Sequence, residues 1–145
     1  MKHMGVMVAV LTLAVTSVGR AADTKVLKSR DGGCQVTIPA DWEVSSLGAS
    51  ADSPDKKVSA TVSSPKMIDS FSELKTSAKT VYKNSKVIKD SASDFGMEGQ
   101  SIAGAPDVYR AIPVSASKFC IVEAIYKSGD PAIARAVAAS LQASK

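Results

Sequence analysis

The fold of this chain is decided by residues 108–126, which read Val108-Tyr-Arg-Ala-Ile-Pro-Val114, Ser115-Ala-Ser-Lys118 and Phe119-Cys-Ile-Val-Glu-Ala-Ile-Tyr126. The first and last of these segments predict two β-strands, and the short segment between them predicts a turn. The strand at 119–126 is apolar at nearly every position, so apolar side chains point to both of its faces. A strand of this kind lies in the centre of a sheet whose two faces are both covered.

The spacing of these two strands also predicts which residues face one another. If the turn is centred on Ala116 and Ser117, Arg110 lies directly opposite Glu123 on an otherwise apolar face. Opposite charges at facing positions contribute roughly 0.2–1 kcal/mol. We interpret Arg110 and Glu123 as a structural ion pair that fixes the register. The alternative interpretation is a carboxylate, that of Glu123, placed in a binding pocket.

Several other segments extend the sheet. Alternation of apolar and polar residues predicts strands at 34–38 and 58–62, and weaker patterns predict strands at 26–28, 86–92 and 99–103. The stretch 104–107 predicts a turn. Residues 45–55 are rich in Ser, Ala, Gly and Asp, which predicts a mobile loop.

Two segments carry the signals of helices. Ser70 and Glu73 fit a capping box, and apolar residues then recur at helical spacing, which predicts a helix from Phe71 to about Lys83. Asp130 followed by Pro131 predicts the start of a second helix. Its apolar stripe consists of Ile133, Val137 and Leu141, flanked by Ala134 and Ala138. The order of elements predicts an α+β domain, an antiparallel β-sheet flanked by two main α-helices.

Residues 1–21 have the pattern of a secretory signal peptide. Lys2 and His3 form a basic start, residues 6–18 are almost continuously apolar, and Ala21 ends a short segment of small residues. This pattern predicts cleavage after Ala21, a single α+β domain at 22–145 and a periplasmic or secreted location. The apolar run is shorter than the roughly 20 residues that span a bilayer, so an integral membrane protein is not expected. An uncleaved signal that acts as an anchor is the alternative.

The two cysteines, Cys34 and Cys120, both fall in predicted strands. An even number of cysteines in an exported chain favours a disulfide. Closing a loop of about 85 residues contributes roughly 4 kcal/mol in the chain-entropy model. Two buried free thiols and a redox pair are the alternatives, and a redox pair normally requires closely spaced cysteines near a helix start.

Composition excludes several classes of chemistry. Export removes His3, the only histidine of the chain, and with it histidine-based catalytic and metal sites. The formal net charge is +4, without clustered Arg among aromatic residues, so nucleic-acid binding is not expected. Ser72 and Lys75 match a Ser-x-x-Lys motif of penicillin-binding enzymes, but this spacing recurs at Ser53/Lys56, Ser63/Lys66 and Ser115/Lys118. We therefore predict no catalytic residue, no cofactor and no metal site.

Five residues are candidates for a binding surface. Lys75, Lys79 and Lys83 form a row beside the apolar stripe of the first helix, suited to anionic lipid headgroups or an acidic partner. The alternative is a solvated helix face whose aliphatic stems cover the edge of the core. Trp42 and Tyr109 are candidates to line a cleft between sheet and helix, and the alternative for Trp42 is a core anchor.

The run Val36-Thr-Ile-Pro39-Ala-Asp-Trp42, followed by a loop, a strand and a capped helix, resembles the PsbP-like family. The resemblance extends from Cys34 to about Leu141 in the order of elements. It implies an antiparallel sheet between helices, an α/β/α sandwich, and a non-enzymatic binding or accessory role.

The leading functional hypothesis is therefore a non-catalytic exported accessory protein that binds a protein partner or a component of the cell envelope. The serine-rich segment 45–55 and the lysine row are its expected contact surfaces. The first alternative is a small-molecule or lipid carrier that uses a sheet–helix cleft lined by Trp42 and Tyr109. The second alternative is a small hydrolase with a Ser–Lys or paired-carboxylate site.

Overall fold

A computed structural model describes residues 23–127 and 130–145, and the predicted signal peptide lies outside these residues. The strands are β1 (Thr24–Lys28), β2 (Cys34–Pro39), β3 (Glu43–Val44), β4 (Ser50–Asp52), β5 (Val58–Ser63), β6 (Lys86–Asp90), β7 (Phe95–Gln100), β8 (Pro106–Ser115), β9 (Lys118–Tyr126) and β10 (Gln142–Ala143). The helices are α1 (Phe71–Val81) and α2 (Ala132–Ala139).

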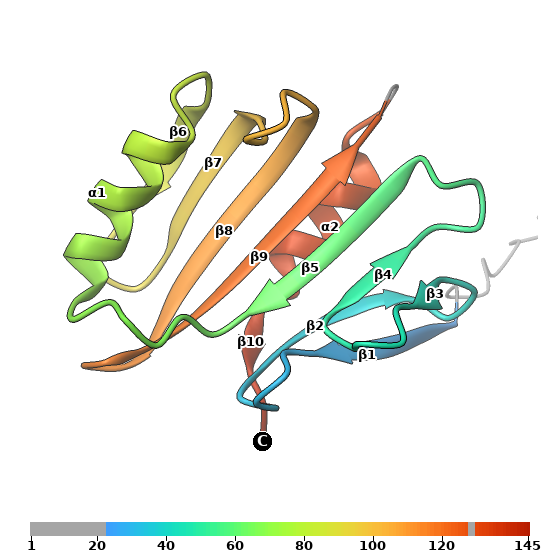
Figure 1. Cartoon of the computed structure of the whole chain (residues 1–145), viewed down its shortest axis with the longest axis horizontal. Coiled ribbons are helices and arrows are strands. Elements are labelled where there is room, and N and C mark those ends of the chain that lie inside the picture. The colour runs from blue at the N-terminus through green and yellow to red at the C-terminus, as the bar shows by residue number, and fades with distance from the viewer. Residues whose placement is uncertain (1–22, 128–129) are drawn as a thin grey trace, which may run out of the picture.

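Seven of these strands form one antiparallel sheet in the order β3-β4-β5-β9-β8-β7-β6. Strand β9 is the middle strand, as its two apolar faces predict, and it pairs with β5 on one side and β8 on the other (Figure 1). A second, three-stranded antiparallel sheet has the order β1-β2-β10. The sequence analysis did not separate this small sheet from the large one.

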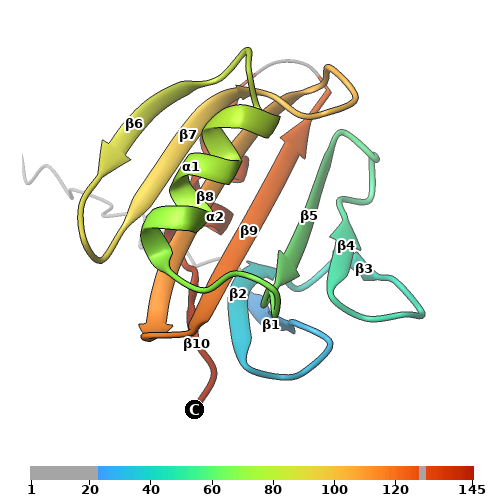
Figure 2. The same cartoon turned by 60° about the vertical axis from the view of Figure 1, so that its left-hand side comes forward.

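The two helices cover opposite faces of the large sheet. Helix α1 lies over β7 and β8, whereas α2 lies behind the sheet, on the same side as the small sheet (Figures 1 and 2). The predicted α+β architecture, an antiparallel sheet flanked by two helices, is confirmed. We call the two sides of the large sheet the α1 face and the α2 face.

Each face has its own hydrophobic core. The α1 face buries Leu74, Ala78, Phe95, Met97, Tyr109, Ala111 and Phe119. The larger core on the α2 face joins the small sheet, the large sheet and α2; its members include Leu27, Val36, Ile38, Trp42, Val62, Val122, Ala134 and Val137. The alternation along β9 therefore sends Phe119 and Val122 into different cores, as the sequence predicts.

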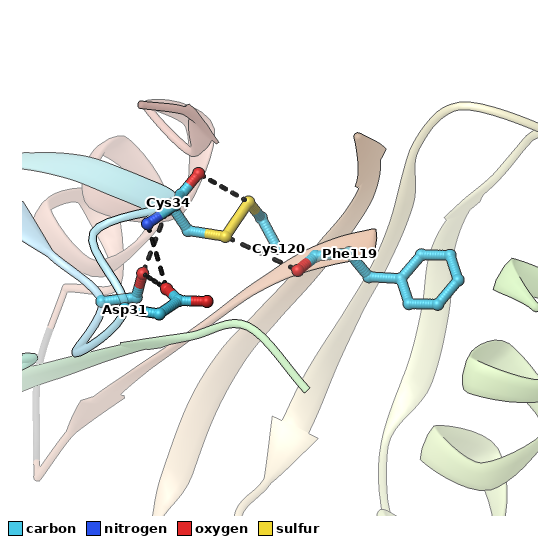
Figure 3. The surroundings of a disulfide bond; sticks show 6 residues. Asp31, Cys34, Phe119 and Cys120 are labelled. Carbon is cyan, nitrogen blue, oxygen red and sulfur yellow. Dashed lines mark hydrogen bonds between the residues drawn. A yellow bond between two sulfur atoms is a disulfide. The ribbon is translucent and has the colours of Figure 1, made fainter. Parts of the chain in front are cut away.

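The predicted disulfide is present and joins the small sheet to the large one. Cys34 of β2 and Cys120 of β9 are bonded with an S–S distance of 1.99 Å, and both residues are fully buried. The side chain of the adjacent Phe119 points away from the bridge toward α1 (Figure 3), where its ring stacks on Phe71. The bridge thus lies on the α2 face and closes a loop with a sequence separation of 86.

Helix α1 begins where the capping signal predicts and ends two residues earlier than expected. The Ser70 hydroxyl accepts a hydrogen bond from the Glu73 N–H at 3.1 Å. In a capping box the Glu73 carboxylate would accept the Ser70 N–H. Here it accepts the Asp69 N–H instead, at 3.0 Å. The helix stops at Val81 because Tyr82 leaves the helical conformation.

Two sequence predictions about this sheet were wrong. The strand predicted at 99–103 lies at Phe95–Gln100, where Phe95 and Met97 are buried and Gly96 and Gly99 obscure the strand pattern. The segment 45–55 is not a structureless loop, because it contains β4 and two buried small residues, Ala49 and Ala51. Alanine gives too weak an apolar signal to reveal a strand.

Candidate functional site

The predicted ion pair between Arg110 and Glu123 does not form. The turn is where the sequence places it, with Ser115 opposite Lys118, but Val114 is an extra residue that bulges between Pro113 and Ser115. Beyond the bulge every partner shifts by one position, so Arg110 faces Val122 and Tyr109 faces Glu123. A shift of one residue sends a side chain to the other face of the sheet.

Arg110 therefore lies on the α2 face and has different partners. Its guanidinium binds the Asp94 carboxylate at two points, at 2.9 and 3.1 Å, and donates to the Ala138 and Ala139 carbonyls at the end of α2. Arg135 of α2 binds Glu98 of β7 in the same two-point way, at 2.7 and 2.9 Å. Both pairs tie α2 to the sheet and have a structural role.

The lysine row is not a free basic surface. Lys75 and Lys79 both bind Asp90 of β6, at 2.7 and 3.2 Å, and their ammonium groups lie over the rings of Phe71 and Phe95. Lys83 follows the end of α1 and is exposed. The three lysines therefore do not form one surface, and two of them hold α1 against the edge of the sheet.

Trp42 and Tyr109 do not line a common cleft. Trp42 is 3% exposed in the α2-face core and Tyr109 is 4% exposed in the α1-face core, so the sheet separates them. Ser72 and Lys75 do not form a catalytic pair either, because Lys75 is bound to Asp90 and to the Ser91 carbonyl. The core-anchor interpretation of Trp42 is confirmed.

A groove on the α1 face combines residues that the sequence analysis did not connect. It runs between α1 and the strands β5 and β9 and has a volume of about 230 Å³. Its walls are largely apolar, and its lining residues include Thr61, Ile68, Leu74, Ser77, Val81, Tyr82, Tyr109, Ile121 and Glu123. The groove exists because α1 lies over β7 and β8, to one side of β5 (Figure 2).

Two carboxyl groups lie next to each other at this groove: Glu123 lines it, and Asp107 is buried beside Glu123 without lining it. The register places Tyr109 opposite Glu123, so Asp107, two residues earlier on β8, is the diagonal neighbour of Glu123 on the same face. The Tyr82 hydroxyl donates to the Glu123 carboxylate at 2.8 Å. Asp107 is only 1% exposed, and neither of its carboxyl oxygens accepts a hydrogen bond of standard geometry from residues 23–127 and 130–145; its polar neighbours include Glu123 and the Gly99 N–H.

Burial and, next, the negative charge of Glu123 raise the pKa of Asp107 to about 7. The pKa values of Tyr82 and Tyr109 are also raised, chiefly by burial. Near neutral pH Asp107 therefore holds a proton part of the time, because its charged form is buried next to another carboxylate. We call Asp107 and Glu123 the acid pair.

This arrangement is suited to binding a cation, because the Glu123 carboxylate lines an apolar groove and a second acid is buried behind it. Among the described residues no group of three or more metal-ligating side chains is present.

The sequence analysis placed Asp107 in a turn and counted Tyr82 only as an apolar helix position. Pro113 was the signal that it missed, since proline inside a strand often marks a bulge.

The comparisons with known proteins identify the fold. No family model matches the sequence, and no curated protein matches it. The solution structure of cyanobacterial PsbP (CyanoP) from Synechocystis sp. PCC 6803 matches with a TM-score of 0.55 and 14% identity, over 91% of this chain and 98% of that one. A crystal structure from Bacteroides thetaiotaomicron VPI-5482 matches with a TM-score of 0.53 and 15% identity, over 86% of this chain.

This chain spans about half of the Bacteroides structure, of which 49% is covered. At these identities the similarity concerns the fold alone, and the chain has the PsbP-like fold that its sequence resembles. In the part of the chain that the structure describes, no helix has the length and apolarity required to cross a membrane. The disulfide is of the kind that persists in oxidising compartments outside the cytoplasm.

Proposed function

We propose that this protein is an exported, non-catalytic accessory protein that binds a segment of a partner protein in the groove beside α1. The observation that carries this proposal is the Glu123 carboxylate on the wall of an apolar groove, with Asp107 buried directly beside it. Buried polar groups without good partners are rare in folded proteins, and each one calls for an explanation.

The size of the groove favours a side chain of a partner protein over a small-molecule cargo. Its volume is about 230 Å³, whereas sites for cofactors and drug-sized ligands have roughly 300–1,000 Å³. A lipid chain or a cofactor therefore exceeds the space in this groove. The two residues named for the carrier cleft lie on opposite faces of the sheet, and Trp42 borders a separate pocket of about 660 Å³.

The free edges of the large sheet are less suited to a partner than the groove. Strand β6 forms one edge and is exposed along its length, but it carries Lys86 and Lys89 and an irregular register at Ile88. Charged side chains and bulges are the usual means by which proteins prevent pairing at an edge. At the other edge, β3 has only two residues.

Two neighbouring residues of α1 provide a matched test of groove binding. Ser77 lines the groove, whereas Thr76 is exposed on α1 and does not line it. A photo-crosslinking amino acid is placed at each position in the native host, and the protein crosslinked from position 77 is identified and purified. Binding of that protein is then measured with Ser77→Trp and Thr76→Trp. We expect Ser77→Trp to weaken binding at least tenfold and Thr76→Trp to leave it unchanged. Equal affinities for both variants contradict the proposal.

Export is supported by the disulfide and by the leader-like pattern of residues 1–21. We expect the protein from the envelope or periplasmic fraction to begin at Ala22 and to contain no free thiol. N-terminal sequencing and thiol titration of the denatured, unreduced protein measure both quantities. A cytosolic form with Met1 in place and both cysteines reduced contradicts export.

A further inference from the structure

We infer that the groove binds the ammonium group of a lysine side chain at Glu123, and that this binding displaces the proton held on the adjacent buried Asp107. This inference rests on the proposed function, because the lysine belongs to the partner segment that occupies the groove. It adds the chemical class of the ligand and predicts that binding is coupled to the release of a proton.

The first step is the state of Asp107. Its side chain is 1% exposed, its carboxyl oxygens accept no hydrogen bond of standard geometry from the described residues, and the Gly99 N–H only partly offsets the effect of burial on its pKa. A buried carboxyl group with so little compensation is either protonated or neutralised by a cation. Glu123 lies beside Asp107 and lines the groove, so a cation that contacts Glu123 also neutralises the charge that Asp107 experiences.

The second step is the absence of a competing cation inside the groove. None of the described residues that line it is Lys or Arg. The nearby lysines of α1 are engaged elsewhere, since Lys75 and Lys79 both bind Asp90. The acid pair therefore differs from Asp94 and Glu98, which have Arg110 and Arg135 as permanent partners.

The third step is the geometry of the acceptors. Glu123 of β9 lines the groove, Asp107 of β8 is buried beside it, and the hydroxyl of the facing Thr61 is hydrogen-bonded to Ser50 at 3.0 Å. An ammonium group is a compact charge with three donors, whereas a guanidinium presents a planar fork that matches both oxygens of a single carboxylate. One Glu123 oxygen already accepts the Tyr82 hydroxyl, which favours the one-point contact of an ammonium group over the fork.

The fourth step is the fit of the rest of the lysine side chain. Leu74, Val81 and Ile121 line the groove and offer apolar contact to its four methylene groups. The rings of Tyr82 and Tyr109, whose centroids are 5.1 Å apart, lie beside the acid pair, and aromatic rings attract an ammonium group. The groove therefore suits both the stem and the charged end of lysine.

The exchange of ions is balanced. One ammonium group enters, and one proton passes from Asp107 to the solvent, so the net charge at the acid pair and its ligand stays the same. The groups that face the pair are the hydroxyls of Tyr82, Tyr109 and Thr61, and the two tyrosines stay neutral because their pKa values are raised. Because burial raises the pKa of Asp107 to about 7, the affinity for an ammonium group rises about tenfold between pH 6 and pH 8.

The test uses three blocked amino acids as probes, Nα-acetyl-N-methylamides of lysine, norleucine and arginine. Each is titrated into the oxidised, isotope-labelled protein at pH 6 and pH 8, with NMR shifts of residues in the groove as the readout. We expect the lysine probe to bind with millimolar affinity, at least fivefold tighter than norleucine or arginine, and about tenfold tighter at pH 8 than at pH 6. Equal binding of lysine and norleucine overturns the inference, as does preference for arginine.

Variants separate the acid pair from other carboxylates. We expect Asp107→Asn to remove the pH dependence of lysine binding and Glu123→Gln to weaken binding at least fivefold. Glu98→Gln, on the α2 face, is the matched control and leaves binding unchanged. If Asp107→Asn does not fold, calorimetry of the unchanged protein in two buffers of different ionisation enthalpy still measures the proton released near pH 6. Binding without proton release overturns the inference.

The outcomes also separate this inference from the proposed function. If the partner binds and Ser77→Trp blocks it, but the lysine probe does not bind, the groove is a partner site with a different ligand chemistry. If the lysine probe binds but Ser77→Trp leaves partner binding unchanged, the proposed function is wrong and the cation site stands alone.

Discussion

The carboxylates on the two faces of the large sheet have opposite environments. On the α2 face, Asp94 binds Arg110 and Glu98 binds Arg135. The pKa values of both carboxyl groups are lowered, chiefly by the hydrogen bonds from these arginines. On the α1 face, Asp107 and Glu123 lie together without a cation, and burial raises the pKa of Asp107.

The difference indicates which face is built for stability and which for recognition. The α2 face carries the disulfide, the larger core, the small sheet and the Arg110–Asp94 and Arg135–Glu98 pairs, so these two carboxylates are paired within the chain. The α1 face has a groove lined by Glu123, with the acid Asp107 buried beside it. Strained or unsatisfied groups persist where the rest of the fold is stable enough to hold them, and they concentrate at functional sites.

The largest expected effect is on the α2 face, from replacing both cysteines by serine. Cys34→Ser with Cys120→Ser removes a bridge with a sequence separation of 86, and we expect the free energy of unfolding to fall by about 4 kcal/mol. Urea denaturation of the oxidised protein and of the double variant measures this. Lysine binding under native conditions is expected to stay unchanged. A loss below about 1 kcal/mol contradicts the proposal that the disulfide makes the α2 face the more stable one.

The second effect also concerns the α2 face. Arg110→Met leaves Asp94 with only Lys89 and frees two carbonyl groups at the end of α2. We expect a loss of about 2–3 kcal/mol, since the pair is mostly buried, with side-chain exposures of 24% and 13%. The loss shrinks at acid pH, because Arg110 lowers the pKa of Asp94 and that stabilisation disappears as Asp94 is protonated.

A double variant provides the control for this prediction. Asp94→Leu in the Arg110→Met background removes the carboxylate that the first substitution leaves without its main partner. We expect it to recover part of the lost stability, because replacing both members of a buried pair by apolar groups costs less than removing one. Denaturation curves at pH 2 and pH 7 measure both effects. A loss that is equal at the two pH values contradicts the assigned role of Arg110.

The third effect has the opposite dependence on pH and concerns the acid pair. The folded pKa of Asp107 is raised from 3.8 to about 7, so its contribution to stability is complete below about pH 4 and is lost as the pH rises to about 7. Asp107→Asn does not titrate, and we expect it to stabilise the protein at pH 8 by about 2 kcal/mol, less than the full shift implies because a buried charge is partly relieved by water. Unfolding free energies from pH 4 to pH 8 test this. A variant less stable than the unchanged protein at pH 8 contradicts it.

Sequence reasoning predicted the parts of this fold that depend on strong local signals. Alternation located β2 and β5, a nearly continuous apolar run located β9, the serine cap located the start of α1, and the even cysteine count predicted the bridge. The weak elements were missed where small residues carry the pattern, as in β4, whose only buried residue is Ala51. These are positions at which burial comes from the tertiary fold and not from the local sequence.

The candidate site was missed for a different reason. Glu123 was singled out correctly as a carboxylate on an apolar face, but its partner was assigned from a regular register. One bulged residue, Val114, moved Arg110 to the other face and brought Tyr109 and Asp107 beside Glu123 instead. A functional site that depends on the pairing of two strands is sensitive to a single inserted residue, whereas the fold class is not.

The smallest expected effect tests whether the two ion pairs of the α2 face, Arg110–Asp94 and Arg135–Glu98, are equivalent. Arg135 binds Glu98 with good geometry, at 2.7 and 2.9 Å, but the side-chain exposures of 56% and 21% leave the pair open to solvent. We expect Arg135→Ala to shift the urea midpoint measurably at low ionic strength and hardly at all in 0.5 M salt, because exposed pairs are weak and screened. Arg110→Met is the control and keeps most of its effect in salt. If salt weakens the Arg110–Asp94 and Arg135–Glu98 pairs equally, the difference in their burial does not affect their strength. In that case surface charge contributes more than the core to holding α2 on the sheet.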